Sequence, residues 1–348
     1  MAENYVINSG KYNFFEDSKL PMSELPNKLL YFLEERIPPT LRSLVEEHIS
    51  RNGFEFQKVT YAAPDAEKIE KLQWADAVFF APGRYLSDEI FSHCPHIRLM
   101  QLWSSGYDKF NIKSALKYNI PVANNGGGNA SSVAEHAVLL MLSVYKWLPH
   151  SHHRTITGNW AGNSHGMDMF MLEHKTVGII GFGNIGRQVA QKLKGFNVKL
   201  FYFDIKRADQ AVEEEYQVTY LPLHELLIQS DIITLHVHHN EATRNMIGEK
   251  EFAIMKSNAI LINVSRAQIV EPHAFFNALK SGRIHGAGLD VYMEEPTTTD
   301  DPLMQLQNIV ATPHMAGCTF DTYQLALSRC MENLHRAMQG EPLQWLVV

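Results

Sequence analysis

Arg266, Glu295 and His314 could together perform hydride-transfer chemistry on a hydroxyl carbon. That chemistry needs a group that takes or gives the hydroxyl proton, a cation that holds a carboxylate, and a nicotinamide fixed nearby. Each of the three residues follows an apolar segment that is typical of a β-strand, at residues 259–264, 286–290 and 309–312. Doubly wound sheets bind their ligands at the carboxyl ends of parallel strands. The sequence therefore predicts that the three side chains lie together beside a ligand site.

Taken singly, each of these residues has an ordinary structural interpretation. His314 could be a surface or core histidine, Glu295 a loop acid, and Arg266 one half of a salt bridge. A strand-end arginine beside a nucleotide site, however, needs an anion to balance its charge, and a substrate carboxylate would be that anion. The common position of the three residues at strand ends favours the catalytic interpretation.

A glycine-rich turn predicts a dinucleotide site. Gly181, Gly183 and Gly186 follow an apolar strand at residues 177–180 and precede a helix predicted over residues 187–193. In this motif the first glycine permits the tight turn, the second lets the backbone approach the diphosphate, and the third allows close packing of helix on strand. The intervening residues, Asn184 and Ile185, would present the helix N-terminus to the diphosphate charge.

The residue at the end of the next strand predicts NAD as the cofactor. This strand, residues 198–203, leads to Asp204, about twenty residues beyond the glycines. A carboxylate at this position can bind both ribose hydroxyls of NAD and would repel the 2′-phosphate of NADP. Lys206 and Arg207 follow closely and could weaken that preference.

Composition indicates a globular protein of two ordinary domains. The chain has 348 residues, of which 45% are hydrophobic and 20% charged. No apolar run is long enough for a membrane span, and the first thirty residues lack the apolar centre of a secretory signal, so we expect cytoplasmic residence. A formal net charge of −7 offers no broad basic face, so we expect small-molecule chemistry rather than nucleic-acid binding.

The order of elements predicts an α/β fold. Residues 1–26 form a polar extension, and from Lys28 strands alternate with helices up to an Asn-Asn-Gly-Gly-Gly loop at residues 124–128. A long apolar-periodic helix follows over residues 132–147, with Ser131 or Ser132 as its cap. A second α/β series begins at Thr176, and a last helix covers residues 320–338. This alternation is typical of parallel sheets that helices cover on both faces.

The motifs together resemble one known family, the D-isomer-specific 2-hydroxyacid dehydrogenases, which act on lactate, glycerate, hydroxypyruvate and phosphoglycerate. The resemblance spans nearly all of the chain from Lys28 onward. Its motifs occur in the family's order, at residues 104–108 (SSGYD), 128–136 (GNASSVAEH), 181–186 (GFGNIG), 263–266 (NVSR), 288–292 (GLDVY) and 312–316 (TPHMA).

The resemblance implies a role for each candidate catalytic residue. Arg266 would hold the carboxylate and carbonyl of the substrate, and His314 would take or give the hydroxyl proton. Glu295 would orient the imidazole and support its charged form, as a carboxylate hydrogen-bonded to imidazole does. The resemblance also implies that the main-chain N–H groups of Ser105 and Gly106 bind the substrate carboxylate.

Other residues would contact the cofactor by the same resemblance. Asp290 would bind the nicotinamide amide. Besides the glycine motif, Asp204, Arg266 and His314, the residues that would line the cofactor are Val237, Val264 and Gly317.

The resemblance further implies two Rossmann-like domains and a homodimer. A discontinuous substrate domain would comprise residues 27–125 and 318–348, and an NAD-binding domain would comprise residues 126–317, with a hinged cleft between them. The homodimer would be built around the helix at residues 132–147.

The sequence departs from the family pattern at two places. After Arg266 the family usually has a glycine, whereas this chain has Ala267 and Gln268, and Gln268 could reach the substrate pocket. After the strand at residues 232–237 the family commonly has a proline-containing turn, whereas this chain has His238 and His239.

Several other residues have both a functional and a structural interpretation. Two histidine-rich tracts, at residues 150–153 and 236–239, resemble metal-binding sequences, but no Asp or Cys ligand set accompanies them, so we expect no metal. Trp103 could border the substrate or pack in the core. Arg84 could meet a substrate phosphate, although a solvated loop position is the expected one. The three cysteines, which we expect to be reduced and structural, are Cys94, Cys318 and Cys330.

Two other functions are compatible with the same scaffold. An NADH-sensing protein of the corepressor kind would bind the cofactor and turn over no substrate. A formate or phosphite dehydrogenase would oxidise a smaller acid, but formate dehydrogenases of this family carry glutamine at the position of Glu295. The main prediction is therefore transfer of hydride between NAD and a small 2-hydroxy or 2-oxo acid.

Overall fold

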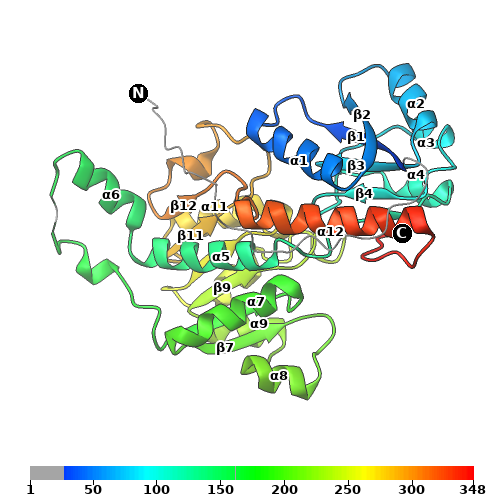
Figure 1. Ribbon diagram of the computed structural model, residues 1–348. Coiled ribbons are helices and arrows are strands. Elements are labelled where there is room, and N and C mark those ends of the chain that lie inside the picture. Colours follow the sequence, from blue (N-terminus) through cyan, green and yellow to red (C-terminus); the bar gives the residue numbers. More distant parts are fainter. Residues whose placement is uncertain (1–26, 161) are drawn as a thin grey trace. The chain divides into compact units, whose positions relative to one another are not determined.

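The computed structural model describes residues 27–160 and 162–348, which form two compact units (Figure 1). Unit 1 contains the described residues up to Trp103, together with Phe110–Ala123 and Cys330–Val348. Unit 2 contains Ser104–Lys109 and Asn124–Arg329. The predicted extension, residues 1–26, lies outside the described residues.

Unit 1 is built on a five-stranded parallel sheet. In chain order its elements are β1 (Asn27–Leu33), α1 (Pro39–Arg51), β2 (Phe54–Thr60), α2 (Asp65–Trp74), β3 (Ala77–Ala81), α3 (Asp88–Ser92), β4 (Met100–Leu102), α4 (Ile112–Lys117), β5 (Val122–Ala123) and, from Cys330, the second half of α12 (Phe320–Gln339). The strand order is β2-β1-β3-β4-β5.

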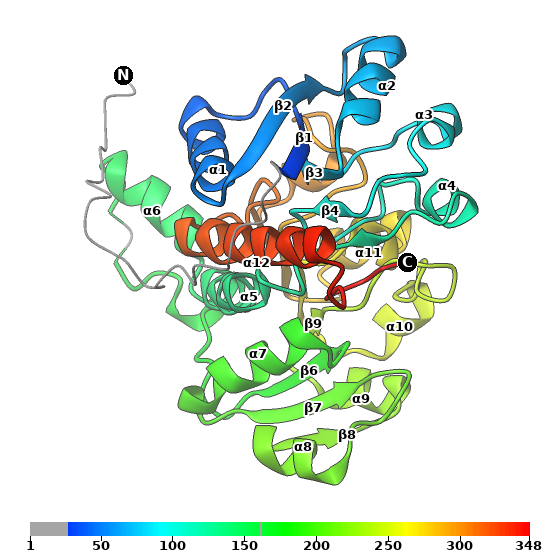
Figure 2. The same cartoon turned by 45° about the vertical axis from the view of Figure 1, so that its right-hand side comes forward.

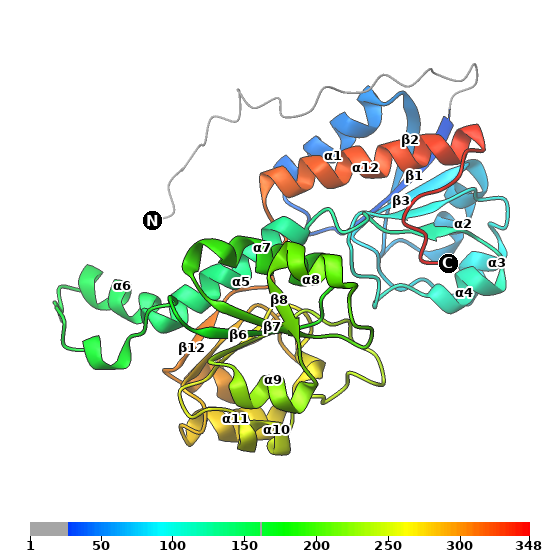
Figure 3. The same cartoon turned by 90° about the horizontal axis from the view of Figure 1, so that it is seen from below.

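Helices cover both faces of this sheet. Side chains of α2, α3 and α4 share one hydrophobic core with the strands. On the other face lie α1 and α12, where the rings of Phe54 and His335 are 4.7 Å apart (Figures 2 and 3). Both faces of β1 and β3 are therefore buried, which explains why these strands are continuous apolar runs rather than alternating ones.

Unit 2 is built on a seven-stranded parallel sheet. Its strands are β6 (Thr176–Ile180), β7 (Lys199–Phe203), β8 (Val218–Tyr220), β9 (Ile232–Leu235), β10 (Ile260–Asn263), β11 (Gly286–Leu289) and β12 (Ile309–Ala311). Its helices are α5 (Ala130–Tyr145), α6 (Leu148–Ile156), α7 (Asn184–Leu193), α8 (Gln210–Tyr216), α9 (Leu223–Gln229), α10 (Glu249–Ile254) and α11 (Pro272–Lys280).

The sheet of unit 2 lies between two layers of helices, each with its own core. Residues of α5 and α7 form one core with the strands, and residues of α9, α10 and α11 form the other (Figure 3). Helix α5 lies very close to β11, where a Cβ on Gly288 would be 2.8 Å from Leu140 Cβ. The long helix predicted from the sequence is therefore mostly buried in its own unit.

The strand order of unit 2 fixes the place of a ligand site. The order β12-β11-β10-β9-β6-β7-β8 reverses its direction between β6 and β9. Open parallel sheets bind ligands at such a switch point, beyond the carboxyl ends of the strands. The glycine-rich turn follows β6, and the segments after β9, β10, β11 and β12 open at the same edge. The α/β fold with two Rossmann-like parallel sheets is confirmed.

Two predicted helix starts are wrong. Helix α5 begins at Ala130, and Asn129 rather than a serine is its N-cap residue. Ser132 is already inside the helix, and its hydroxyl donates to Ala316 O at 2.7 Å. Helix α7 begins at Asn184 rather than at 187, because the extended backbone of Gly183 already forms its N-cap.

The predicted strands are present, but several are shorter than expected. The apolar run at residues 97–102 predicts one strand, but β4 begins only at Met100, since the Ile97 N–H donates to Cys94 O in a turn. In unit 2, β9 to β12 each end one or two residues before the predicted end. The residues just beyond these shortened strands, which include Val264, Asp290 and Thr312, belong to the loops of the candidate site.

Two general expectations can be compared with the structure. Cys94 and Cys330 are buried and belong to no disulfide of the described residues, as expected of structural cysteines, whereas Cys318 is exposed. Over the described ranges, no helix combines the length and the apolar character that crossing a membrane requires.

Candidate active site

The glycine-rich turn after β6 fits a dinucleotide diphosphate. Gly181 has a φ of 96°, and a Cβ there would lie 2.7 Å from the carbonyl carbon of His236. A Cβ on Gly186 would lie 2.1 Å from Gly181 O, so helix and strand pack closely. At Gly183 a Cβ would meet no atom within 4 Å. The turn is therefore tight on its inner side and open on its outer side, as backbone contact with a diphosphate requires.

The first turn of α7 offers free donors at this opening. Asn184 and Ile185 begin the helix, and no side chain of the described residues caps its N-terminus. Uncapped N–H groups and the helix dipole favour an anion at such a position. The predicted diphosphate-binding residues thus come together at one point, and they fit NAD.

Asp204 is fixed beside the same turn. Its Oδ2 accepts a hydrogen bond from the Phe182 N–H at 2.7 Å, so the carboxylate is tied to the glycine motif. Arg207, one of the two cations that could weaken the preference for NAD, forms two bonds with Glu213, from Nε to Oε1 at 2.8 Å and from Nη2 to Oε2 at 2.9 Å. Tyr202 also donates to Glu213 at 2.6 Å. Glu213 therefore offsets the positive charge of Arg207.

His314 and Glu295 form a hydrogen-bonded pair. His314 Nδ1 lies 2.9 Å from Glu295 Oε1, and 46% of the His314 side chain is exposed, against 23% for Glu295. Within the described chain, the second ring nitrogen of His314 has no hydrogen-bond partner. His314 has a φ of 52°, in the left-handed region that non-glycine residues seldom adopt. An exposed imidazole held by a carboxylate, on a strained turn, is typical of a catalytic acid or base.

The electrostatics of Glu295 keep it ionised. Burial by itself would raise the pKa of Glu295, but the hydrogen bond and charge of His314, the Tyr292 N–H and the charge of Lys109 lower it below its ordinary value. Because the pKa of Glu295 is depressed, the pair with His314 contributes stability at pH values above the ordinary pKa of glutamate. This stability is lost as the pH falls through the lowered pKa. At neutral pH the carboxylate is therefore available to support an imidazolium.

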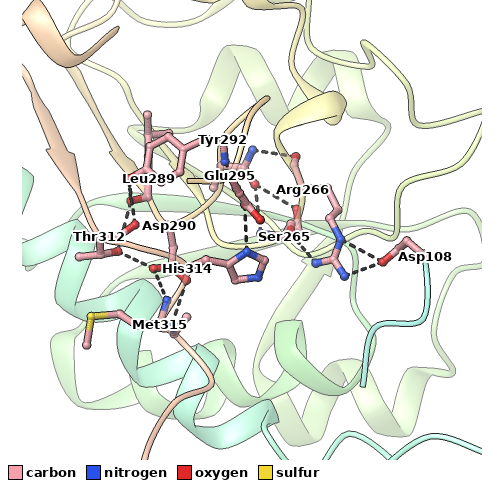
Figure 4. Close-up of polar contacts among 12 residues, drawn as sticks. Asp108, Ser265, Arg266, Leu289, Asp290, Tyr292, Glu295, Thr312, His314 and Met315 are labelled. Carbon is pink, nitrogen blue, oxygen red and sulfur yellow. Dashed lines mark hydrogen bonds and ion pairs between the residues drawn. The ribbon is translucent and has the colours of Figure 1, made fainter. Parts of the chain in front are cut away.

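A buried carboxylate holds the turn that carries His314. Asp290 is 1% exposed; its Oδ1 accepts from Thr312 Oγ1 at 2.6 Å and from the Met315 N–H at 2.9 Å, and its Oδ2 accepts from the Ala316 N–H at 2.9 Å (Figure 4). His136, on α5, lies 2.9 Å from Thr312 Oγ1. Asp290 thus fixes both sides of the His314 turn.

Arg266 points toward Asp108, as Figure 4 shows. Both Nε and Nη2 donate to Asp108 Oδ2, at 3.1 and 2.6 Å, and Nη1 donates to Ser265 O at 2.7 Å. Gly106 lies against the guanidinium, since a Cβ there would be 2.2 Å from Nη2. All of these residues belong to unit 2. Asp108 is part of the SSGYD motif, but the sequence assigned it no role.

The main-chain donors predicted at Ser105 and Gly106 are available. Among the described residues, no acceptor pairs with either N–H group. The Ser105 hydroxyl, by contrast, lies within 2.5 Å of Asn125 Oδ1 and 2.6 Å of Asn129 Oδ1. The side chain is therefore used to hold the loop, and the backbone remains free to bind an anion.

The asparagines that fix this loop were missed in the sequence. Asn125 is 3% exposed, and its Oδ1 also accepts from the Gly127 and Gly128 N–H groups at 3.1 and 3.2 Å. Asn124 Nδ2 donates to Ser105 O at 3.0 Å. The Asn-Asn-Gly-Gly-Gly run predicted a loop, which is confirmed, but nothing in its composition indicated that its amides would bind Ser105.

The other predicted cofactor residues lie at the same edge of the sheet. Val237 follows β9 and contacts the glycine turn, because a Cβ on Gly181 would be 2.7 Å from Val237 N. Val264 follows β10 and is 7% exposed. Gly317 follows the His314 turn and lies beside Asn129, whose Nδ2 would be 3.2 Å from a Cβ at that position.

The histidine-rich tracts make structural contacts. His236 bonds Thr234 Oγ1 at 2.9 Å, and burial lowers its pKa to about 3. His150 packs edge-on against Trp147, with 5.4 Å between ring centroids. Across the described residues, no group of three or more His, Cys, Asp or Glu side chains is placed to hold a metal ion.

Trp103 and Arg84, for which two interpretations were open, both make contacts within unit 1. The ring of Trp103 lies 6.3 Å from that of Phe79. Arg84 forms an ion pair with Glu34 and is about one-third exposed. These contacts match packing for Trp103 and a paired, partly exposed loop position for Arg84.

Residues 138–316 match the family model of the NAD-binding domain of D-isomer specific 2-hydroxyacid dehydrogenases. A glyoxylate reductase from Korarchaeum cryptofilum is 36% identical over 315 residues, which cover 89% of this chain and 93% of that protein. The chain belongs to the D-isomer-specific 2-hydroxyacid dehydrogenase family. A glyoxylate/hydroxypyruvate reductase B from Yersinia pestis is 32% identical over 320 residues, covering 90% of this chain and 95% of the relative.

A solved structure agrees with this assignment. D-lactate dehydrogenase with NAD+ from Lactobacillus jensenii superimposes with a TM-score of 0.77 at 26% identity, covering 92% of this chain and 99% of that one. The dehydrogenase is thus an NAD-linked oxidoreductase that transfers hydride between the cofactor and a small 2-hydroxy or 2-oxo acid.

The Asp290 contacts make a testable prediction about stability. In Asp290→Asn the amide nitrogen cannot accept a hydrogen bond, so at least one buried donor of the His314 turn loses its partner. We expect a loss of about 1–3 kcal/mol of unfolding free energy, measured by chemical denaturation. Asp300→Asn, at an exposed position of the preceding loop, is the matched control and should change stability little. Equal stability of Asp290→Asn and the wild type would show that the carboxylate does not hold the turn.

Proposed function

We propose that this dehydrogenase reduces glyoxylate, hydroxypyruvate or a 2-oxo acid of similar size, with Arg266, Glu295 and His314 as its catalytic set. The observation that carries the proposal is the imidazole–carboxylate pair of His314 and Glu295, on loops that open at the same sheet edge as the Arg266 loop. The names of the relatives support the substrate class, since they are glyoxylate and glyoxylate/hydroxypyruvate reductases.

His314 would handle the proton of the reaction. Its Nδ1 is engaged by Glu295 at 2.9 Å, so the other ring nitrogen, Nε2, is the one that can face a substrate oxygen. In reduction, the imidazolium would give its Nε2 proton to the carbonyl oxygen as hydride reaches the carbonyl carbon. Glu295 would favour the charged imidazole and hold its orientation.

Arg266 would bind the substrate carboxylate together with the free N–H groups of Ser105 and Gly106. A guanidinium and main-chain donors are the groups that recognise a planar carboxylate with several hydrogen bonds. The contact of Gly106 with Arg266 Nη2 supports a shared anion site.

The cofactor would lie along the switch point of the sheet in unit 2. When bound, the cofactor accepts the hydride as NAD+ or supplies it as NADH. The α7 N-terminus would hold the diphosphate, Asp204 the ribose hydroxyls, and Val237, Val264 and Gly317 would line the site. Asp290 is fully engaged by the His314 turn, so any contact it makes with the nicotinamide amide would be additional to that role.

Domain roles follow from these assignments. Unit 2 would be the nucleotide-binding domain and unit 1 the substrate domain, with residues 104–109 contributed to the site in unit 2. We also propose cytoplasmic residence, which stays a prediction from the sequence.

A panel of 2-oxo acids tests the proposal and separates it from an NADH-sensing function. We expect NADH consumption with glyoxylate or hydroxypyruvate, and about a thousandfold lower kcat in His314→Gln with NADH binding retained, since a general acid contributes roughly 10²–10⁴-fold. His224→Gln, on α9, is a control outside the site. No turnover of any acid in the panel would contradict the proposal and favour a sensor, and an unaffected kcat in His314→Gln would contradict the role of His314.

The His314–Glu295 pair predicts a pH effect. Because the carboxylate favours the imidazolium, Glu295→Gln should move the alkaline limb of the reduction profile to lower pH. We expect kcat to fall about ten- to a hundredfold near neutral pH, as for loss of a hydrogen bond to a charged group, and less at acidic pH. Glu294→Gln, at the exposed neighbouring position, should keep the wild-type profile. An unshifted profile in Glu295→Gln would argue against the pairing as the source of the effect.

We propose a homodimer through α5 and the segment that continues it. Most of α5 is buried in its own unit, but Leu139 is 49% exposed, and beyond the helix Ile156 is 67% exposed and Trp160 81% exposed. No residue of α6 is buried, and α6 extends away from the sheet of its unit (Figure 1). Large apolar side chains that are exposed along one segment in this way favour a protein partner.

Sedimentation equilibrium tests the dimer. We expect a dimer for the wild type and a folded monomer for the double variant Leu139→Asp/Ile156→Asp, because two charges cannot be buried in an apolar interface without partners. Leu116→Asp, at a residue of α4 that is 57% exposed, is the control and should remain dimeric. A monomeric wild type would contradict the proposal.

A further inference from the structure

The guanidinium of Arg266 has one pair of N–H groups left for a ligand. It carries five N–H groups. The Nε group and one Nη2 group donate to Asp108 Oδ2 at 3.1 and 2.6 Å, and one Nη1 group donates to Ser265 O at 2.7 Å. Among the described residues, none accepts from the remaining Nη1 and Nη2 groups. Since Asp108 occupies the side-on edge of Nε and Nη2, the edge left for a ligand is the end-on fork of Nη1 and Nη2.

We propose that Asp108 is a positioning residue that selects this end-on fork for the substrate carboxylate. The inference rests on the proposed role of Arg266 and adds a residue to which no function is otherwise assigned. An arginine can bind a carboxylate through its side-on edge, formed by Nε and Nη2, or through its end-on edge, formed by Nη1 and Nη2. Because Asp108 occupies the side-on edge, the substrate carboxylate can bind only through the end-on edge.

The surroundings make this arrangement specific. Gly106 leaves no room for a side chain beside Nη2, because a Cβ would lie 2.2 Å from it, so its unpaired N–H can stand close to the fork. The side chains of Arg266 and Asp108 are 32% and 37% exposed, so the pair is accessible from the site. An ion pair with this exposure adds little to stability, and its main effect is on orientation.

The charge of Asp108 is maintained at neutral pH. Burial would raise the pKa of Asp108, but the charge and hydrogen bonds of Arg266, the residue's own N–H and the charge of His238 lower it below the ordinary value. Asp108 therefore remains an acceptor at every pH at which the dehydrogenase is expected to act. The orientation of Arg266 should not depend on pH in that range.

Substitutions at Asp108 test the proposal. In Asp108→Ala the guanidinium can rotate, and we expect the KM for the 2-oxo acid to rise about tenfold to a hundredfold, while kcat changes less than about threefold and the Kd for NADH is unchanged. Asp108→Asn keeps one acceptor oxygen and should be intermediate, and Asp108→Glu, which keeps the charge, should restore part of the affinity. Glu47→Ala, which removes an exposed ion pair with Arg51, is the matched control.

A lowered or an unchanged KM would overturn the proposed role of Asp108. If Asp108 competes with the substrate for Arg266 instead of orienting it, KM falls in both Asp108→Ala and Asp108→Asn, and the proposal is wrong. An unchanged KM also overturns it. Should Asp108→Ala fail to fold, Asp108→Asn alone decides, because a raised KM supports orientation and a lowered or unchanged one does not.

Direct binding separates this inference from the proposed function. Oxamate, an unreactive carboxylate with a 2-oxo group, can be titrated into the complex of the dehydrogenase with NADH. Its binding is followed by the change in NADH fluorescence. Weaker oxamate binding by Asp108→Ala supports the inference even if no acid is turned over. A wild type that binds oxamate but reduces none of the acids contradicts only the proposed function, and equal binding by wild type and variant contradicts only the role of Asp108.

Discussion

The turn that carries His314 depends on the buried carboxylate of Asp290. A charge that is 1% exposed is costly unless several donors surround it, and here the donors are the Thr312 hydroxyl and the N–H groups of Met315 and Ala316. Each of these donors belongs to the turn. The left-handed backbone of His314 also costs energy, and it persists only where neighbouring contacts enforce it. One interaction therefore satisfies a buried charge and holds a strained backbone, and the direction of the imidazole depends on both.

Those parts of the structure that follow from periodic or local rules could be predicted from the sequence. Parallel strands buried on both faces are continuous apolar runs, so most strands and their order along the chain were visible, and their carboxyl ends indicated where polar residues would meet. The short strands β5 and β8 were not predicted. The glycines had a physical reason at each position: Gly181 for its positive φ, Gly186 for the contact with the strand and Gly183 for its open side. Asp204 followed from its place at the end of β7.

The contacts that complete the site could not be predicted, because they join loops that are far apart in the chain and follow no period. Asp108 and Arg266 are 158 residues apart. No local sequence pattern indicates the contact of Asn125 with Ser105 or that of Glu213 with Arg207, because the fold alone brings these polar residues together. The start of α5 was misplaced for a similar reason: Ser132 looked like a cap, but its hydroxyl bonds Ala316 O, a long-range partner that local rules do not include.

Both cationic side chains of the site are paired with an acid from another segment, and a third acid holds the backbone of the His314 turn. Arg266 contacts Asp108, His314 contacts Glu295, and the backbone of the His314 turn contacts Asp290. The first two pairs are partly exposed, and such pairs contribute little to the free energy of unfolding. Their physical effect is to reduce the number of orientations that the cation can adopt, so that less conformational entropy is lost when a ligand binds. A site built in this way would gain its affinity for a small carboxylic acid because its cations are already oriented when the acid arrives. A ligand with so few atoms cannot gain that affinity from a large number of contacts.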